Sequence, residues 1–244
     1  MHIEPTGARD RDEAEMDALF ADGFPAFITA DPSVKPVIGR VREYFPHLDI
    51  VLLDGEPSIP VATGWGVPFG WDGDPATLPQ TFGGLLRRAV EGHEAGTAAD
   101  TFALCGAVVH PGHKGTGVAS ALVEALVGLG AANRLDRVVA PLRPTMKHRY
   151  PLIPIEQYVT WLRPDGLPLD PWLRLHHRLG GRVVALAPAA QTMVGTVAQW
   201  EAWTGLALPG SGAYVVPDGL APVHVDLDAG TGTYVEPNIW VRHR

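Results

Sequence analysis

The stretch VVHPGHKGTGVASALVEALVGLG, residues 108–130, places a glycine-rich turn between an apolar segment and a helix-forming run. Glycine loses more conformational freedom on folding than any other residue, so a glycine-rich backbone is costly unless something must approach it closely. The first amides of a helix have no acceptor within the helix, and the helix dipole adds partial positive charge there. The stretch therefore predicts a site where a phosphate group docks on the amides that open the helix.

Length and composition limit the class of protein. The 244 residues fit one large domain or two small ones, and an apolar content of 46% is enough for a buried core. A formal net charge of −8 argues against a surface for nucleic acid or anionic membrane, so we expect neither as a partner. The single cysteine, Cys105, excludes an internal disulfide, and no apolar run reaches the roughly 18 residues of a membrane helix. The N-terminus lacks the pattern of a secretory signal, and cytoplasmic residence is the expectation.

The residues on both sides of the glycine turn predict a parallel unit. Residues 101–109 and 137–142 are almost wholly apolar, as expected of strands that are buried on both faces. Between them, Leu122, Leu126 and Leu129 form the stripe of a helix over residues 118–132. A strand, a helix and a second apolar strand within about 40 residues make a right-handed crossover of parallel strands.

Further elements are predicted before and after this unit. They comprise helices at about 10–22, 33–45, 78–94 and 170–179, strands at 49–53, 59–67 and 182–187, and short antiparallel strands beyond residue 188. Asp170 is expected to cap the helix that it precedes, with Pro171 in the first turn. Residues 146–169 are proline-rich and irregular.

Two nucleotide-binding patterns fit the glycine turn poorly. A nucleoside-triphosphate loop needs adjacent Gly and Lys followed by Ser or Thr, and Gly112-His113-Lys114 breaks that order. A dinucleotide fingerprint would need its acidic residue at the carboxyl end of the next strand, whereas Asp136 precedes that strand. A nicotinamide-dependent oxidoreductase is thus a weaker alternative, and a glycine turn that binds nothing is another. A metal site is not expected, since His110 and His113 have no third ligand at a recognisable spacing.

Residues 108–126 resemble the coenzyme A signature of the GNAT family of acyltransferases. Lys114-Gly115-Thr116-Gly117-Val118-Ala119 fills its Q/R-x-x-G-x-G/A element, with Lys in place of the usual Arg. The family order of elements also matches the predicted order from about residue 10 to residue 187. The resemblance implies a mixed α/β fold with a mostly antiparallel sheet, a central parallel pair of splayed strands, helices on both faces and, here, a strand-rich C-terminal extension.

The resemblance also implies site residues. In GNAT proteins the backbone of the first splayed strand receives the pantetheine arm and the thioester carbonyl, and the following amides hold the pyrophosphate. Carried over by position, the backbone amide of Cys105 stabilises the oxyanion, and coenzyme A binds at Ala107, Val108, Val109, His113, Lys114, Gly115, Thr116, Gly117, Val118, Ala119 and Ser120.

The resemblance gives weaker signals for the general acid and the general base of the acyl transfer. Family members carry a Tyr four residues before the glycine that ends the later helix, and His176 stands at that place, reckoned from Gly180. His176 is therefore the expected acid for the departing thiolate, although histidines in such helices are more often structural. Four carboxylates are open as candidate bases, and they are Glu156, Glu201, Asp226 and Glu236.

The resemblance implies an acetyl-CoA-dependent or other acyl-CoA-dependent N-acyltransferase. Its acceptor would be a primary amine of a small molecule, which attacks the thioester directly. A non-catalytic acyl-CoA-binding or regulatory module on the same fold is the alternative, and assembly as a homodimer is left open. We expect residues 1–190 to form the coenzyme-binding domain, with an insertion at about 146–169, and residues 191–244 to form an extension packed on the same domain.

Overall fold

A computed structural model describes residues 1–9, 16, 19, 23–56 and 58–244. The helix predicted at about 10–22 lies largely outside the described residues. The described strands form one sheet in the order β1-β2-β3-β4-β5-β9-β8-β7, with β6 paired to β9. The strands are β1 His2–Pro5, β2 Asp49–Asp54, β3 Ile59–Phe69, β4 Thr101–Val109, β5 Arg137–Leu142, β6 Arg182–Thr196, β7 Gly212–Tyr214, β8 Val223–Asp226 and β9 Thr231–Arg242.

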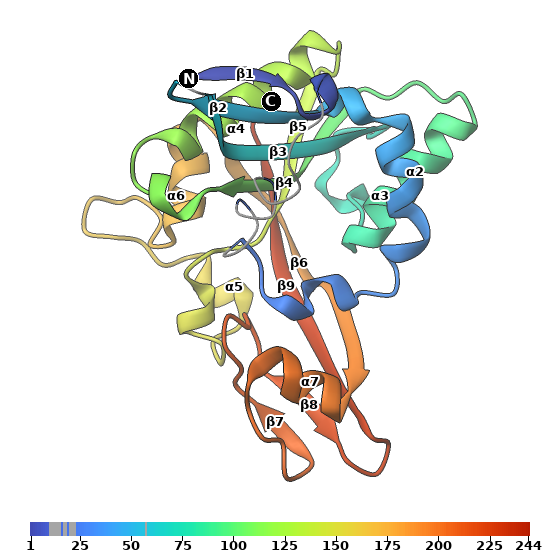
Figure 1. The fold of residues 1–244 in the computed structure, drawn as a ribbon, viewed down its shortest axis with the longest axis vertical. Coiled ribbons are helices and arrows are strands. Elements are labelled where there is room, and N and C mark those ends of the chain that lie inside the picture. Colours follow the sequence, from blue (N-terminus) through green and yellow to red (C-terminus); the bar gives the residue numbers. More distant parts are fainter. Residues whose placement is uncertain (10–15, 17–18, 20–22, 57) are drawn as a thin grey trace.

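Helices cover both faces of this sheet (Figure 1). The α-helices are α2 Lys35–Tyr44, α3 Phe82–Glu94, α4 Val118–Ala132, α5 Ile155–Tyr158, α6 Pro171–Arg178 and α7 Val197–Thr204. Short 3-10 turns connect them: η1 Thr6–Ala8, η2 Ala26–Ala30, η3 Pro46–Leu48, η4 Pro75–Thr77, η5 Pro111–His113 and η6 Lys147–Arg149. The main core joins the sheet to α2, α3 and α4 through buried aliphatic and aromatic residues.

Among the described strands, β4 and β5 form the single parallel pair, and every other pairing is antiparallel. The bounds of β4 and β5 match the sequence prediction residue for residue, and α4 has the predicted start and the approximate predicted end. The predicted fold class, a mixed and mostly antiparallel sheet with a central parallel pair and a strand-rich C-terminal part, is confirmed.

The C-terminal part is a long hairpin of β6 and β9 (Figure 1). One end of β9 pairs with β5 in the central sheet, and its other end pairs with β8 around a second core that contains Phe27 and Trp200. The predicted division at residue 190 lies within β6, and β9 contributes to both ends of the molecule. Of the described residues, no helix is long and apolar enough to cross a membrane.

Candidate functional site: a wedge between two parallel strands

The pairing between β4 and β5 stops part of the way along both strands. Three residue pairs are in register, and the last is Ala103 with Val139. Beyond it β4 continues to Val109 while β5 continues to Leu142 and pairs with β9 instead. Among the described strands, the backbone of residues 104–109 therefore has no partner on the β5 side. We call this opening, between residues 104–109 of β4 and 140–142 of β5, the wedge.

A β-bulge lies on β4 inside the wedge. Trp65 of β3 faces Gly106, and the next residue of β3, Gly66, faces Leu104, so Cys105 is the extra residue. A Cβ on Gly106 would lie 2.4 Å from Nε1 of Trp65, which means that the indole packs directly against the Gly106 backbone. Bulges re-aim backbone groups, and this one turns the amides around Cys105 out of the regular ladder.

The thiol of Cys105 donates a hydrogen bond to the carbonyl of Ala103 at 3.5 Å. Burial raises its pKa far above the ordinary value, although the backbone amide of Val67 opposes the shift. A thiol with a raised pKa is a poor nucleophile at neutral pH. The prediction for Cys105 concerned its backbone amide, and the structure places that amide at the bulge.

The glycine turn joins the wedge to the N-terminus of α4. Gly117, the N-cap residue, has a φ of 92°, and Gly115 has a φ of 81°, both in the left-handed region that glycine adopts without strain. No side chain of the described residues caps this end of α4, and its first helical bond runs from the Ala121 amide to the Gly117 carbonyl. Within the described part of the chain, the amides that open α4 are therefore available to an anion.

The loop before this helix is held by its own residues. Nδ1 of His110 accepts a hydrogen bond from the Gly112 amide, and the hydroxyl of Thr116 donates to the carbonyl of His113. The predicted coenzyme residues from Ala107 to Ser120 thus form one continuous edge, from the unpaired part of β4 to the first turn of α4. Their role in binding stays a prediction.

The two faces of the sheet differ around the wedge. On one face α4 packs closely, because a Cβ on Gly64 would lie 2.8 Å from Leu126. Helix α3 packs on the opposite face. The ring of Trp65 lies 6.2 Å from that of Phe82 on α3. Nε1 of Trp240 donates to the carbonyl of Pro79, just before the helix.

His176 lies on α6 and is only 2% exposed. Its Nδ1 lies 2.8 Å from Nε2 of His243, and its ring packs edge-on against Trp172. Burial, and then the neighbouring His243, lower the pKa of His176 to about 3, so the imidazole is neutral near pH 7. Its surroundings are those of a structural histidine, and the role of acid stays a prediction.

The four candidate bases lie in different parts of the fold. Glu156 is exposed on α5. Glu201 accepts a hydrogen bond from the Leu208 amide, and Asp226 accepts one from the Ala229 amide. Both lie in the C-terminal part of the chain. Glu236 alone lies on β9 near the end of β5, with an exposed fraction of 0%.

Glu236 lies in a cluster of polar side chains. Its Oε1 accepts from Nε of Arg143 at 2.9 Å, and its Oε2 accepts from the hydroxyl of Tyr234 at 2.9 Å. Burial raises the pKa of Glu236, and the Arg143 charge and the Tyr234 bond oppose that shift. Arg143 also donates to the carbonyl of Asp218 at 2.6 Å, which ties β5 to the C-terminal part of the chain.

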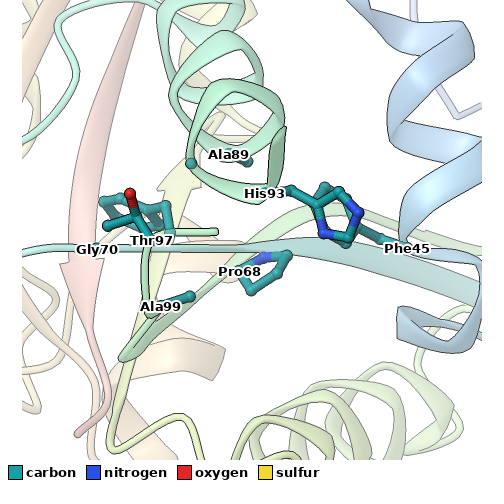
Figure 2. Close-up of a pocket in the computed structure, with 9 residues that line it drawn as sticks. Phe45, Pro68, Gly70, Ala89, His93, Thr97 and Ala99 are labelled. Carbon is teal, nitrogen blue, oxygen red and sulfur yellow. The ribbon is translucent and has the colours of Figure 1, made fainter. Parts of the chain in front are cut away.

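A small cavity lies elsewhere, between α3 and the start of β4 (Figure 2). It has a volume of about 80 Å³ and is lined by Pro68, Ala99 and the ring of His93. Phe69 on its wall pairs with Thr101, at the paired end of β4, so the cavity is away from the wedge. Among the described residues, no group of three or more His, Cys, Asp or Glu is placed to hold a metal ion.

Sequence reasoning missed the bulge, the indole of Trp65 and the Arg143–Glu236 pair. The sequence Gly64-Trp65-Gly66 within a strand was a usable signal, because glycine inside a strand often marks a bulge or a close approach of backbone. The pair between Arg143 and Glu236 had no such signal, since 93 positions separate the two residues.

Solved structures of known proteins share this architecture. The loading GNATL domain of CurA from Lyngbya majuscula superposes with a TM-score of 0.58 at 15% identity, covering 94% of this chain and 91% of that one. The GNAT-like decarboxylase GphF, in complex with isobutyryl-CoA, gives a TM-score of 0.57 at 19% identity, with coverage of 100% and 98%. The fold is therefore that of GNAT proteins.

Comparison of sequences agrees with the fold. The chain is 34% identical over 179 residues to the arginine N-acetyltransferase avaD of Aspergillus versicolor. The matched region covers 65% of this chain and 62% of that protein. No protein-family profile matches the chain. The chain therefore has the fold of GNAT proteins, and it spans about 62% of the length of the N-acetyltransferase that it resembles in sequence.

Proposed function

We propose that the chain transfers an acyl group, most simply acetyl, from coenzyme A to a primary amine of a small molecule. The observation that carries this proposal is the wedge, which opens beside free amides at the start of α4. The amides of α4 suit a pyrophosphate. The unpaired backbone of residues 104–109 suits the peptide-like groups of a pantetheine arm, because buried backbone groups require hydrogen-bond partners.

The chemistry follows from this placement. The nitrogen of a neutral amine attacks the thioester carbonyl, the C–N bond forms, and the C–S bond breaks to release the coenzyme thiol. The nitrogen gives up one proton, and the departing sulfur takes up one. Amides at the bulge around Cys105 and Gly106 stabilise the negative oxygen of the intermediate, and each donor of that kind contributes about 3 kcal/mol in well-studied enzymes.

An amine acceptor is supported by the similarity to an arginine N-acetyltransferase. That likeness spans 62% of the relative, so arginine enters here as the first acceptor to try. Glu236, with a pKa raised by burial, is the candidate base with the most suitable position and proton affinity. Because its carboxylate is enclosed, a water molecule would have to relay the proton.

Calorimetry and a thiol-release assay test the proposal. We expect acetyl-CoA to bind and NAD to fail to bind, with free thiol released when L-arginine, agmatine or putrescine is present. Binding of acetyl-CoA without thiol release from any of the three amines would favour a non-catalytic acyl-CoA-binding module. Binding of NAD in place of acetyl-CoA would contradict the proposal as a whole.

A further inference from the structure

The amide side chain of Asn238 has an unsatisfied oxygen. Asn238 is only 4% exposed, and its Oδ1 has no hydrogen-bond partner among the described residues. A buried carbonyl oxygen without a donor is unfavourable, and most such groups in proteins are paired. The described part of the chain therefore does not explain why this position holds an amide and not an aliphatic side chain.

The position of Asn238 relates it to the wedge. Leu142 of β5 pairs with Ile239 of β9, so Asn238 is the next residue of β9 at the point where β5 ends. The last parallel pair is Ala103 with Val139, and three residues further along each strand lie Gly106 and Leu142. By these registers Asn238 is near the level of the bulge, across the wedge from β4.

Asn238 also faces the side of the sheet that α4 does not cover. Alternate residues of a strand share a face, so Asn238 points the same way as Trp240, which bonds to Pro79 before α3. Trp65, over Gly106, contacts α3 as well. A molecule on this face would approach the thioester from the side opposite the α4 helix.

The neighbours of Asn238 already have partners of their own. Continuing the register of β5 and β9 puts Arg143 opposite Asn238, and the Arg143 guanidinium bonds to Glu236 and to the carbonyl of Asp218. Glu236 in turn is held by Tyr234. The pair of opposite charges leaves little net charge, which favours a neutral donor group beside Asn238 over an ion.

We infer that Asn238 is a positioning residue for the amine acceptor, whose N–H group donates a hydrogen bond to Oδ1. The inference rests on the proposed function. A neutral primary amine has two N–H groups and one lone pair. One N–H held by Asn238 fixes the nitrogen while the lone pair is directed at the thioester carbonyl. The amide oxygen takes no proton, so Asn238 orients the amine and a separate group or water removes the proton.

A leucine at this position separates function from stability. Asn238→Leu removes the oxygen and the cost of burying it unpaired, so the melting temperature should rise by about 2 °C or more. The KM for the amine should rise about tenfold or more, while the Kd for acetyl-CoA stays unchanged. Asn238→Asp keeps an oxygen at the same place and should recover most of the amine KM.

Asn133 supplies a matched control at the other end of α4. Its amide nitrogen donates to the carbonyl of Leu129 and its side chain is exposed. Asn133→Leu removes a satisfied bond, so it should lower the melting temperature and leave the amine KM and the acetyl-CoA Kd as they are. The two variants are thus expected to change stability in opposite directions.

The outcomes distinguish the inference from the proposed function. Thiol release is measured with L-arginine, agmatine and putrescine. If the wild-type chain releases no thiol with any of them, the proposed function is contradicted and this inference falls with it. If the wild type is active and Asn238→Leu keeps its amine KM, or melts at a lower temperature than the wild type, the inference alone is overturned, because the amide then has a structural role.

Discussion

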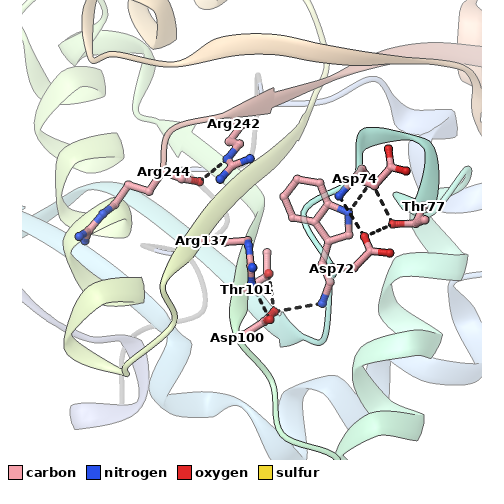
Figure 3. Close-up of polar contacts among 9 residues, drawn as sticks. Asp72, Asp74, Thr77, Asp100, Thr101, Arg137, Arg242 and Arg244 are labelled. Atoms are coloured by element: carbon pink, nitrogen blue, oxygen red, sulfur yellow. Dashed lines mark hydrogen bonds and ion pairs between the residues drawn. The ribbon is translucent and has the colours of Figure 1, made fainter.

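Asp100 and Arg137 form an ion pair at the base of the wedge, with 2.5 Å between Oδ2 and Nη1 (Figure 3). The two residues stand where the parallel pairing of β4 and β5 begins. Oδ1 of Asp100 also accepts from the Trp71 amide and the Thr101 hydroxyl. The base of the wedge is therefore fastened by side chains, while its mouth is held apart by the bulge and by the pairing of β5 with β9.

Asp100→Asn should weaken this base in a way that depends on pH. Burial raises the pKa of Asp100, but the bonds from Thr101 and Trp71 and the charge of Arg137 outweigh it and lower the pKa. A lowered carboxyl pKa stabilises the fold above the unfolded value of about 4, and that contribution is lost as the pH falls through the folded value. Both side chains are partly exposed, so the expected loss at pH 7 is at most about 1 kcal/mol.

Urea unfolding at pH 7 and at pH 3 measures this effect. The difference between the wild type and Asp100→Asn should be largest at pH 7 and smaller at pH 3. Asp165→Asn, in an exposed pair with Arg163, serves as the control and should change little at either pH. Equal losses at both pH values would show that the Asp100 charge contributes nothing.

Gly117→Ala should reduce the affinity for acetyl-CoA. At a φ of 92° an alanine is strained by about 1–2 kcal/mol, so the turn would shift and the amides of α4 would lose their common direction. We expect the Kd measured by calorimetry to rise about tenfold or more. Gly128→Ala, at an exposed position inside α4 with open space around it, should stabilise the helix and leave the Kd unchanged.

Gly106→Ala tests the contact between the bulge and the indole of Trp65. The added methyl group would lie 2.4 Å from Nε1, and overpacking of this kind costs about 1–3 kcal/mol. The melting temperature and kcat should both fall. In the double variant Trp65→Ala/Gly106→Ala the melting temperature should return towards that of Trp65→Ala alone. A Gly106→Ala protein as stable as the wild type would mean that the indole moves aside at no cost.

The sequence alone was sufficient to predict β4, α4 and β5, because local signals define these elements. Two apolar runs and a glycine turn mark both ends of the unit, and no distant residue is needed to place it. The same holds for α6, where the Asp170 side chain accepts from the amides of Trp172 and Leu173, as expected of a cap.

The long hairpin was not predictable in the same way. The sequence indicated short strands after residue 188, whereas β6 and β9 are long and β9 continues through Pro237. Proline cannot donate to a strand partner, so it normally argues against a strand. The structure accommodates it with an irregularity of β6 between Ala187 and Gln191, opposite Asn238 and Glu236. That compensation comes from a distant segment, and Asn238 and the pairing of Arg143 with Glu236 were missed for the same reason.

Lys147→Met should loosen the insertion from the C-terminal part of the chain. The buried ammonium of Lys147 donates to the carbonyls of Tyr150 and Leu220, at 2.8 and 2.7 Å, and burial lowers its pKa to about 8. Without it both carbonyls lose a donor, at about 1–3 kcal/mol for each one that stays unpaired. Limited proteolysis within residues 146–169 should become faster, whereas Lys35→Met, at an exposed position, should show the wild-type rate.

The pair of His176 and His243 should make the protein sensitive to acid. Burial lowers the pKa of both imidazoles, that of His176 to about 3 from an ordinary value of 6.5. Because the unfolded chain binds the proton more readily, the stability that depends on neutral His176 is complete above about pH 6.5. It is lost as the pH falls towards 3, at up to about 1.4 kcal/mol per pH unit.

His176→Asn keeps a polar group near Nδ1 and removes the titration. The unfolding free energy is measured with urea between pH 4 and 6.5. Its slope against pH should become flatter by up to about 1.4 kcal/mol per pH unit, which corresponds to one proton. The same variant decides the acid role, because loss of a general acid lowers kcat by about 10²–10⁴. Since His176 is buried and neutral, we expect kcat to change less than about tenfold, with the acetyl-CoA Kd unchanged. A drop of a hundredfold or more, together with an unaltered pH slope of stability, would instead assign the proton transfer to His176.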